Sequence, residues 1–171
     1  MPEIVVPLTI RPLTHDDLPA MAWYGPPTAL AAVAEAIDRA HRGEVDYLAV
    51  CPPSGRPVAV GGADYTKPPG AATIWQLSVL ESLQSCGIGT LLIHALEDRI
   101  RARGLRWAEL GVDINAARPQ VLYERLGYTV SGSETASWNQ ESADGTVSLY
   151  ETQVTLLRKD LQAIPEAPGE S

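Results

Sequence analysis

The segment Gln84-Ser85-Cys86-Gly87-Ile88-Gly89-Thr90 carries the residues best suited to bind phosphate. It follows an apolar, strand-like run that ends near Leu80, and an amphipathic helix is expected to begin directly at Ile88. This order leaves free backbone N–H groups at the positive end of a helix, where they favour an anion. Gly87 and Gly89 lack the Cβ atoms that would keep an anion away from the backbone. The segment therefore predicts a phosphate site.

Two common nucleotide motifs do not fit this turn. A Walker loop requires Gly-Lys-Ser/Thr, whereas Gly89 is followed by Thr90 without a lysine. A dinucleotide fingerprint requires a third glycine where this chain has Leu92, and Asp113 does not end a clean parallel strand–helix–strand repeat. On these residues alone, a tight strand-to-helix turn without a ligand remains the alternative.

Three carboxylates are candidates for a general base. Glu109 is expected in the middle of a strand, on the same face as Trp107, where a half-buried carboxylate could accept a proton directly or through water. An ion-paired strand residue is the alternative for Glu109. Asp64, at the end of a strand, and Glu81, just before the phosphate turn, are rivals.

The histidines and cysteines are weaker candidates for catalysis or metal binding than the carboxylates. Histidine is a common general base, but His15, His41 and His94 are expected on the surface or at helix ends. The two cysteines lack metal-ligand spacing, so we expect free thiols and no metal. Cys86 lies within the phosphate turn.

The elements that position these residues alternate between strand and helix patterns. Strands are expected over 8–13, 47–50, 57–63, 72–80 and 107–112, helices over 14–21, 28–42, 88–103 and 119–126, and a hairpin over 128–138 and 147–157. Thr28 is expected to cap the second helix, and Thr14 or Asp16 the first. Residues 162–171 are expected to be disordered. The pattern indicates one mixed α/β domain spanning 1–171.

Composition excludes several classes of protein. A formal net charge of -8 over 171 residues argues against a nucleic-acid surface and is compatible with a cationic substrate. The sequence holds neither a run of about 20 apolar residues nor a basic-then-apolar leader. We therefore expect no membrane contact and a cytoplasmic location.

The segment from Trp75 to Gly127 resembles the core of the GNAT family, the Gcn5-related N-acetyltransferases. The resemblance rests on four pieces, Leu77-Ser78-Val79-Leu80, the turn continued to Leu92, Glu109-Leu110-Gly111-Val112, and Val121-Leu122-Tyr123-Glu124-Arg125-Leu126-Gly127-Tyr128. It implies the GNAT fold, an α/β (α+β) architecture with a mixed, mostly antiparallel twisted sheet of about seven strands flanked by about four helices.

The resemblance also implies an acetyl-CoA site, with direct transfer of the acetyl group to a primary amine in a ternary complex. The pyrophosphate would lie on the turn, and the pantetheine arm would pair with the preceding strand like an added strand. The implied contacts are Leu77, Ser78, Val79, Gln84, Ser85, Cys86, Gly87, Ile88, Gly89 and Thr90. Tyr123 matches a tyrosine that acts as general acid in many relatives, and a core tyrosine is the alternative. Relatives carry asparagine where this chain has Ala116, so Asn115 is expected either to touch CoA or to form a plain Asx turn.

The acceptor is expected to be a small-molecule or peptide amine. Acidic character favours a cationic one, such as a polyamine, an aminoglycoside or a peptide amino terminus. Aromatic residues could wall its pocket or belong to the core, namely Trp23, Tyr24, Tyr65, Trp75 and Trp138. A non-catalytic acyl-CoA sensor is the alternative function, and the acyl group preferred is left open. The resemblance further implies a homodimer built on the terminal hairpin.

Overall fold

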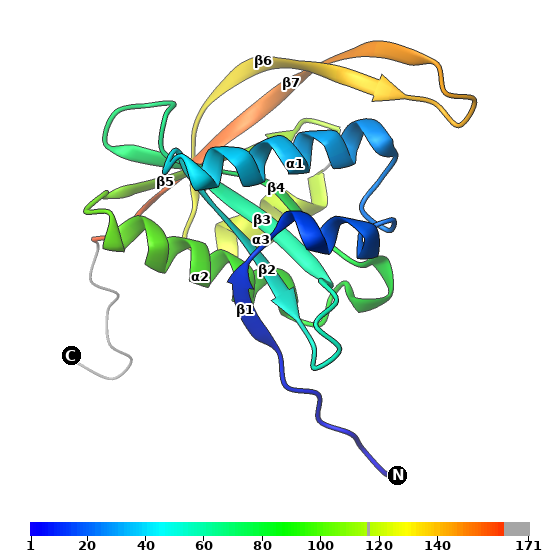
Figure 1. Cartoon of the computed structure of the whole chain (residues 1–171). Helices are drawn as coiled ribbons and strands as arrows, with labels where there is room; N and C mark the ends of the chain where they lie inside the picture. The colour runs from blue at the N-terminus through cyan, green and yellow to red at the C-terminus, as the bar shows by residue number, and fades with distance from the viewer. Residues whose placement is uncertain (116, 163–171) are drawn as a thin grey trace, which may run out of the picture.

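The computed structural model describes residues 1–115 and 117–162, and its centre is one seven-stranded sheet in the order β1-β2-β3-β4-β5-β7-β6 (Figure 1). The strands are β1 (Thr9–Pro12), β2 (Val45–Cys51), β3 (Ala59–Asp64), β4 (Ala71–Val79), β5 (Trp107–Asp113), β6 (Thr129–Glu141) and β7 (Val147–Asp160). Neighbouring strands are antiparallel except β4 and β5, which are parallel. The expected mixed, mostly antiparallel sheet is confirmed. The tail expected to be disordered lies, after residue 162, outside the described residues.

Helices cover both faces of this sheet. They are the α-helices α1 (Pro27–His41), α2 (Ile88–Ala102) and α3 (Ala117–Arg125) and the 3-10 helices η1 (His15–Ala20) and η2 (Glu81–Leu83). Buried residues of α1 pack with Tyr47 and Ala49 of β2 on one face, and α2 packs on the other (Figure 1). Alternation along β5 directs Ala108, Leu110 and Val112 towards α2. None of the helices in the described ranges is long and apolar enough to cross a membrane.

The sheet opens between its two central strands. Parallel pairing of β4 and β5 covers only Ala71–Thr73 with Trp107–Glu109, and Ile74–Val79 continue without a partner in β5. The strand pair β3–β4 has a bulge in the same region, since its register shifts between Val60 and Gly62. Gln76 takes a left-handed φ of 56° there, and its side-chain oxygen accepts a hydrogen bond from the Tyr47 hydroxyl at 3.0 Å. The result is a gap in the sheet beside the second half of β4.

The start of α1 differs from the expectation. Thr28 was expected as the N-cap, but the helix begins at Pro27, with Pro26 in the cap position. Proline suits the first helical position because its missing N–H has no intrahelical partner there. Thr28 instead donates its hydroxyl to Glu141 Oε2 at 2.7 Å. Thr14 does precede η1 as expected, and Asp17 accepts its backbone N–H.

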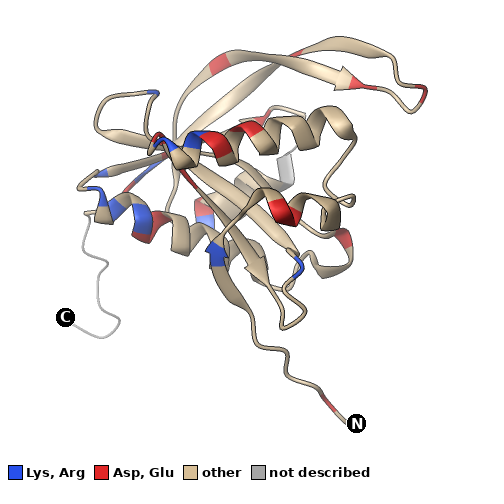
Figure 2. Ribbon diagram, in the orientation of Figure 1, with Lys and Arg blue, Asp and Glu red and all other residues tan. Residues whose placement is uncertain are grey.

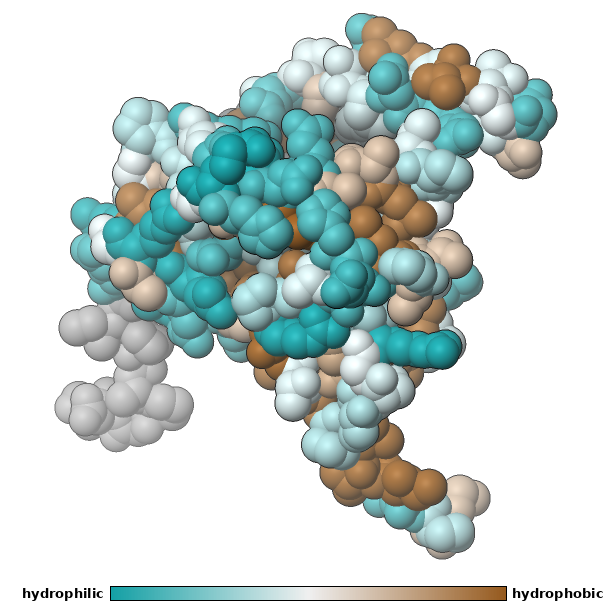
Figure 3. Space-filling model, viewed as in Figure 1, coloured by the Kyte–Doolittle hydropathy of each residue, from teal (hydrophilic) through white to brown (hydrophobic). Residues whose placement is uncertain are grey.

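The hairpin β6–β7 extends well beyond the sheet on the α1 side (Figure 1). Pairing of β7 with β5 ends at Val154, and from there β6 and β7 form a two-stranded arm. Between Thr129 and Leu157 the sequence has four acidic residues and no lysine or arginine, so this stretch carries half of the net charge of -8 (Figure 2). Apolar side chains are also exposed along the arm and on the N-terminal segment (Figure 3), among them Val130, Trp138, Val147, Leu149, Ile4 and Val5.

Candidate functional site

The turn before α2 has the geometry expected of an anion site. Gly87 is the N-cap with φ 85°, and Ser85 also has a positive φ of 62°. Within the described chain, the backbone N–H groups from Ser85 to Thr90 donate to no protein acceptor. A Cβ on Gly87 would meet nothing within 4 Å, so the space in front of the turn is open. Successive free N–H groups at a helix N-terminus form a cradle for phosphate oxygens.

Gln84 fixes this turn against the end of β4. Its side-chain amide donates to the Val79 carbonyl at 3.2 Å, and its backbone N–H donates to Glu81. Val79 is one of the residues expected to pair with pantetheine. Its carbonyl already accepts this hydrogen bond from Gln84. Cys86 is exposed, and its thiol lies 3.6 Å from the Gln84 carbonyl.

A hollow of about 370 Å³ joins this turn to the α1 side of the sheet. It is lined by Trp23, Tyr24, Ser78, Val79, Glu81 and Gln84. Trp23 is held by its indole N–H, which donates to the Pro57 carbonyl at 3.1 Å. Two of the five aromatic residues suggested as pocket walls thus line a hollow beside the phosphate turn. Tyr47 and Gln76 anchor β4 nearby through their hydrogen bond. The sequence could not indicate this contact, because it depends on the bulge between β3 and β4.

Tyr123 is half-buried on α3 and packs against the main core. Its ring lies edge-on to Tyr128, with centroids 6.2 Å apart. Burial raises the pKa of the Tyr123 phenol, which keeps the proton on its hydroxyl at neutral pH. The packing of Tyr123 against the core therefore leaves its hydroxyl protonated, so a packing role does not exclude a role as general acid.

The three candidate bases lie in different places. Glu109 Oε2 lies 3.3 Å from Arg158 Nε, in a pair set by the register of β5 and β7. Asp64 is buried and bonded to Arg39 and Thr66. Burial alone would raise the pKa of Asp64, but these hydrogen bonds outweigh it and hold the pKa below its usual value. Glu81 is exposed and lines the hollow.

Asn115 takes part in an Asx turn, with Asp113 as the accepting residue. Its backbone N–H donates to Asp113 Oδ1 at 2.9 Å. Asp113 also accepts from Tyr150 and Thr152 of β7. These hydrogen bonds lower the pKa of Asp113, and the largest contribution comes from the backbone N–H of Asn115. Ala116, where relatives carry asparagine, lies outside the described residues.

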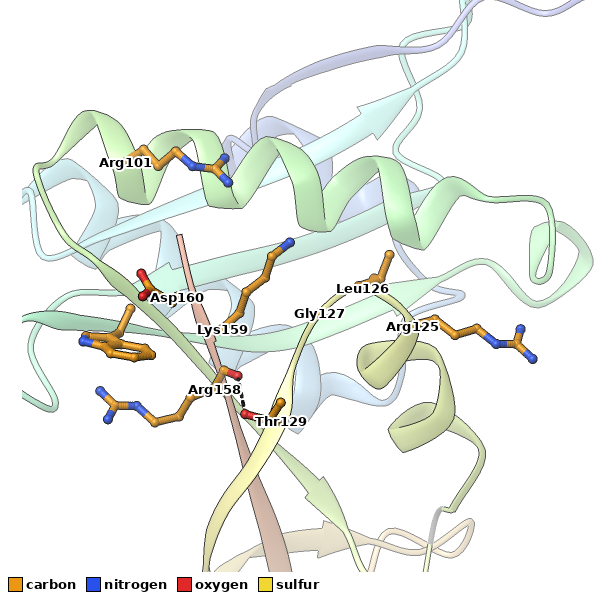
Figure 4. Close-up of a pocket in the computed structure, with 9 residues that line it drawn as sticks. Arg101, Arg125, Leu126, Gly127, Thr129, Arg158, Lys159 and Asp160 are labelled. Atoms are coloured by element: carbon orange, nitrogen blue, oxygen red, sulfur yellow. Dashed lines mark hydrogen bonds between the residues drawn. The ribbon is translucent and has the colours of Figure 1, made fainter. Parts of the chain in front are cut away.

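A larger hollow, about 490 Å³, lies at the opposite end of α2 (Figure 4). Its lining includes Arg101, Arg125, Arg158 and Lys159, yet most of these charges have partners. Lys159 bonds to the buried Glu97, and Arg101 to Asp98. Because α2 rises about 1.5 Å per residue, Arg101 lies about 20 Å from the phosphate turn. This hollow is therefore separate from the candidate site.

Comparison with known proteins agrees with this geometry. The profile of the acetyltransferase (GNAT) family matches residues 11–128. The chain belongs to the GNAT family of acetyltransferases. As a member of that family it is an acyltransferase. A search of curated protein sequences gave no match.

Solved structures share the fold over most of the chain. One is the ribosomal-protein-S18-alanine N-acetyltransferase of Escherichia coli, with 21% identity, a TM-score of 0.66, and coverage of 93% of this chain and 97% of that one. An aminoglycoside 6'-N-acetyltransferase complexed with coenzyme A has 19% identity, a TM-score of 0.66, and coverage of 92% and 99%. A spermidine N-acetyltransferase that is a chimera of the Vibrio cholerae protein and hSSAT has 16% identity, a TM-score of 0.67, and coverage of 90% and 95%. The expected GNAT fold is confirmed.

Proposed function

We propose that the protein transfers the acetyl group of acetyl-CoA directly to a primary amine. The observation that carries this proposal is the row of free N–H groups from Ser85 to Thr90 beside the gap in the sheet. The turn offers donors to a pyrophosphate, and the unpaired side of β4 offers backbone groups to a pantetheine amide. The aminoglycoside 6'-N-acetyltransferase with the same fold was solved in complex with coenzyme A, which supports the same donor.

In the proposed reaction the amine nitrogen forms a bond to the thioester carbonyl carbon, and the carbon–sulfur bond breaks. Tyr123 would donate its hydroxyl proton to the departing thiolate, as the matching tyrosine does in many relatives. Turnover with Tyr123→Phe should fall at least about tenfold while the affinity for CoA stays the same. If turnover is unchanged, Tyr123 is not the acid.

For the amine proton, we propose Glu81 ahead of Glu109. Glu81 lines the hollow next to the end of β4, whereas the charge of Glu109 is held by Arg158. Glu81→Gln should then lower the rate more than Glu109→Gln, with acetyl-CoA binding preserved in both. The reverse order would restore Glu109 as the base, and equal loss of binding would indicate a structural role for either residue.

A cationic acceptor is proposed for this hollow. Trp23 and Tyr24 supply aromatic faces, Glu81 supplies a carboxylate, and the acidic arm β6–β7 reaches the start of α1 through the bond between Glu141 and Thr28. Aromatic faces and carboxylates both attract an ammonium group. The neighbours named for spermidine, aminoglycoside and a protein alanine support an amine of this kind.

The test is acetyl-CoA turnover against spermidine, an aminoglycoside and a peptide with an amino-terminal alanine, read as free thiol. Amine-dependent thiol release supports the enzyme. Binding of acetyl-CoA without release in the presence of any amine would favour the alternative, a non-catalytic acyl-CoA sensor. Parallel assays with propionyl-CoA and acetyl-CoA identify the preferred acyl group.

We further propose a homodimer formed through the hairpin arm. Val147 and Leu149 are exposed and lie two positions apart on β7, so they share one face of the arm, and exposed apolar side chains that lie together mark interaction sites. Light scattering on the eluting protein should give twice the chain mass. A Leu149→Asp variant should give the monomer mass, and a wild-type monomer would refute the proposal.

A further inference from the structure

Three exposed side chains meet where η1 begins beside the C-terminal half of α1. They are His15, Asp38 and His41, and each has a potential ligand atom within 4.8 Å of those of the other two. His15 Nε2 lies 2.8 Å from Asp38 Oδ1, and the rings of His15 and His41 lie edge to face with centroids 6.1 Å apart. Among the described residues, this is the one group of three or more histidine, cysteine or acidic side chains with such spacing.

Two imidazole nitrogens and a carboxylate oxygen form a typical ligand set for a divalent transition metal. Asp38 and His41 lie three positions apart and share one face of α1, so a single helix presents two of the ligands. In a tetrahedral zinc site with bonds of about 2.0–2.1 Å, ligand atoms lie about 3.3 Å apart. The observed separations need to close by about 1.5 Å at most, and exposed side chains can rotate that far.

We propose that His15, Asp38 and His41 bind a divalent transition-metal ion such as Zn²⁺, with water completing its coordination. Cysteine spacing in the sequence indicated no metal, and the histidines were expected to have surface roles. The set is not visible as a motif because His15 lies on a different element from Asp38 and His41. None of the three residues lines the hollow beside the phosphate turn.

The competing interpretation is a surface ion pair between His15 and Asp38. The two side chains are 44% and 56% exposed, and an ion pair exposed to this degree contributes little to stability. The two interpretations differ in what they require of His41. An ion pair needs only His15 and Asp38, whereas a metal site loses a ligand when His41 is changed.

A bound metal would connect η1 to α1 and so close the chain between them into a loop. That loop contains Trp23 and Tyr24, which line the hollow of the proposed acceptor. The bound ion would restrict the motion of this segment. It would also raise the stability of the domain to unfolding, because an ion that binds only the folded state stabilises that state.

The experiment is a calorimetric titration of the untagged full-length chain with Zn²⁺, without acetyl-CoA, together with thermal unfolding at saturating Zn²⁺. We expect one ion per chain and a rise in Tm. His41→Gln and Asp38→Asn should each weaken binding at least about tenfold, since losing a direct ligand costs no less than losing an outer one. His94→Gln is the matched control, because His94 is exposed on α2 and outside the cluster.

Mg²⁺ at the same concentration should give no shift, because it prefers oxygen ligands. No saturable Zn²⁺ binding, or equal binding by wild type and His41→Gln, would overturn the proposal. Loss of binding in His94→Gln to the same degree as in His41→Gln would do so too. The titration does not involve acyl transfer, so its outcome is independent of the proposed activity.

Discussion

Replacing Gly87 by alanine tests whether the turn before α2 is a phosphate site. Gly87 has φ 85°, and a Cβ there would meet nothing within 4 Å. The cost to the free protein therefore comes from backbone conformation alone, about 1–2 kcal/mol for a non-glycine residue in the left-handed region. For a domain of this size that lowers Tm by about 2–8 °C.

Gly43 provides the control. It follows the end of α1 with φ 76°, and a Cβ on it also meets nothing within 4 Å. Gly43→Ala should therefore lower Tm by a similar amount without touching the turn. Any additional effect of Gly87→Ala on ligand binding can then be separated from loss of stability.

The affinity for CoA should differ sharply between the two variants. An alanine that relaxes φ at Gly87 rotates the neighbouring N–H groups away from the phosphate, and a hydrogen bond to a charged group contributes about 1.5–3 kcal/mol. One lost bond raises Kd about 10- to 150-fold. Calorimetric titration with CoA, well below both melting temperatures, measures this. If Kd of Gly87→Ala stays within twofold of that of Gly43→Ala, the pyrophosphate does not bind at this turn.

Three further predictions concern packing and charge. Gly111→Ala would place a Cβ 2.5 Å from Val154 Cγ1, so we expect a loss of about 1–3 kcal/mol in denaturant unfolding, which Val154→Ala in the same chain should partly restore. Tyr128→Phe removes the 2.8 Å bond to the buried Glu97 and should cost about 1–3 kcal/mol, against a smaller loss for Tyr150→Phe on the outer strands. Asp64 has a lowered pKa, so its charged form stabilises the fold at neutral pH, and this contribution is lost as the pH falls below the ordinary value of 3.8. Asp64→Asn should therefore cost about 1–3 kcal/mol at pH 7, and the gap to wild type should shrink in acid.

Local features of the sequence were enough to predict the glycine turn before α2 and most elements, whereas phosphate binding at that turn stays a prediction. Gly87 can adopt the left-handed backbone that the turn requires, and the apolar positions after it repeat with a helical period. The turn therefore depends on a few residues that are close together in the chain. The start of α1 was placed wrongly because Thr28 looked like a cap, whereas two prolines precede it and one of them occupies the first helical position.

Features that depend on pairing between distant segments could not be predicted. The gap beside β4 arises where parallel pairing with β5 stops and where Gln76, a residue that seldom adopts positive φ, forms a bulge. Glu109 had two possible roles in the sequence, and its ion pair with Arg158 depends on the register of β7. His15 meets Asp38 only because η1 lies against α1.

The gap between β4 and β5 has a consequence for stability as well as for binding. If acetyl-CoA fills the gap as proposed, the donor takes the place of a missing strand, and the folded state gains RT ln(1 + [L]/Kd) at each concentration of free donor. A fall in acetyl-CoA would then lower both the reaction rate and the lifetime of the enzyme, because more chains would be open to proteolysis. The abundance of this acetyltransferase would follow the supply of its own substrate.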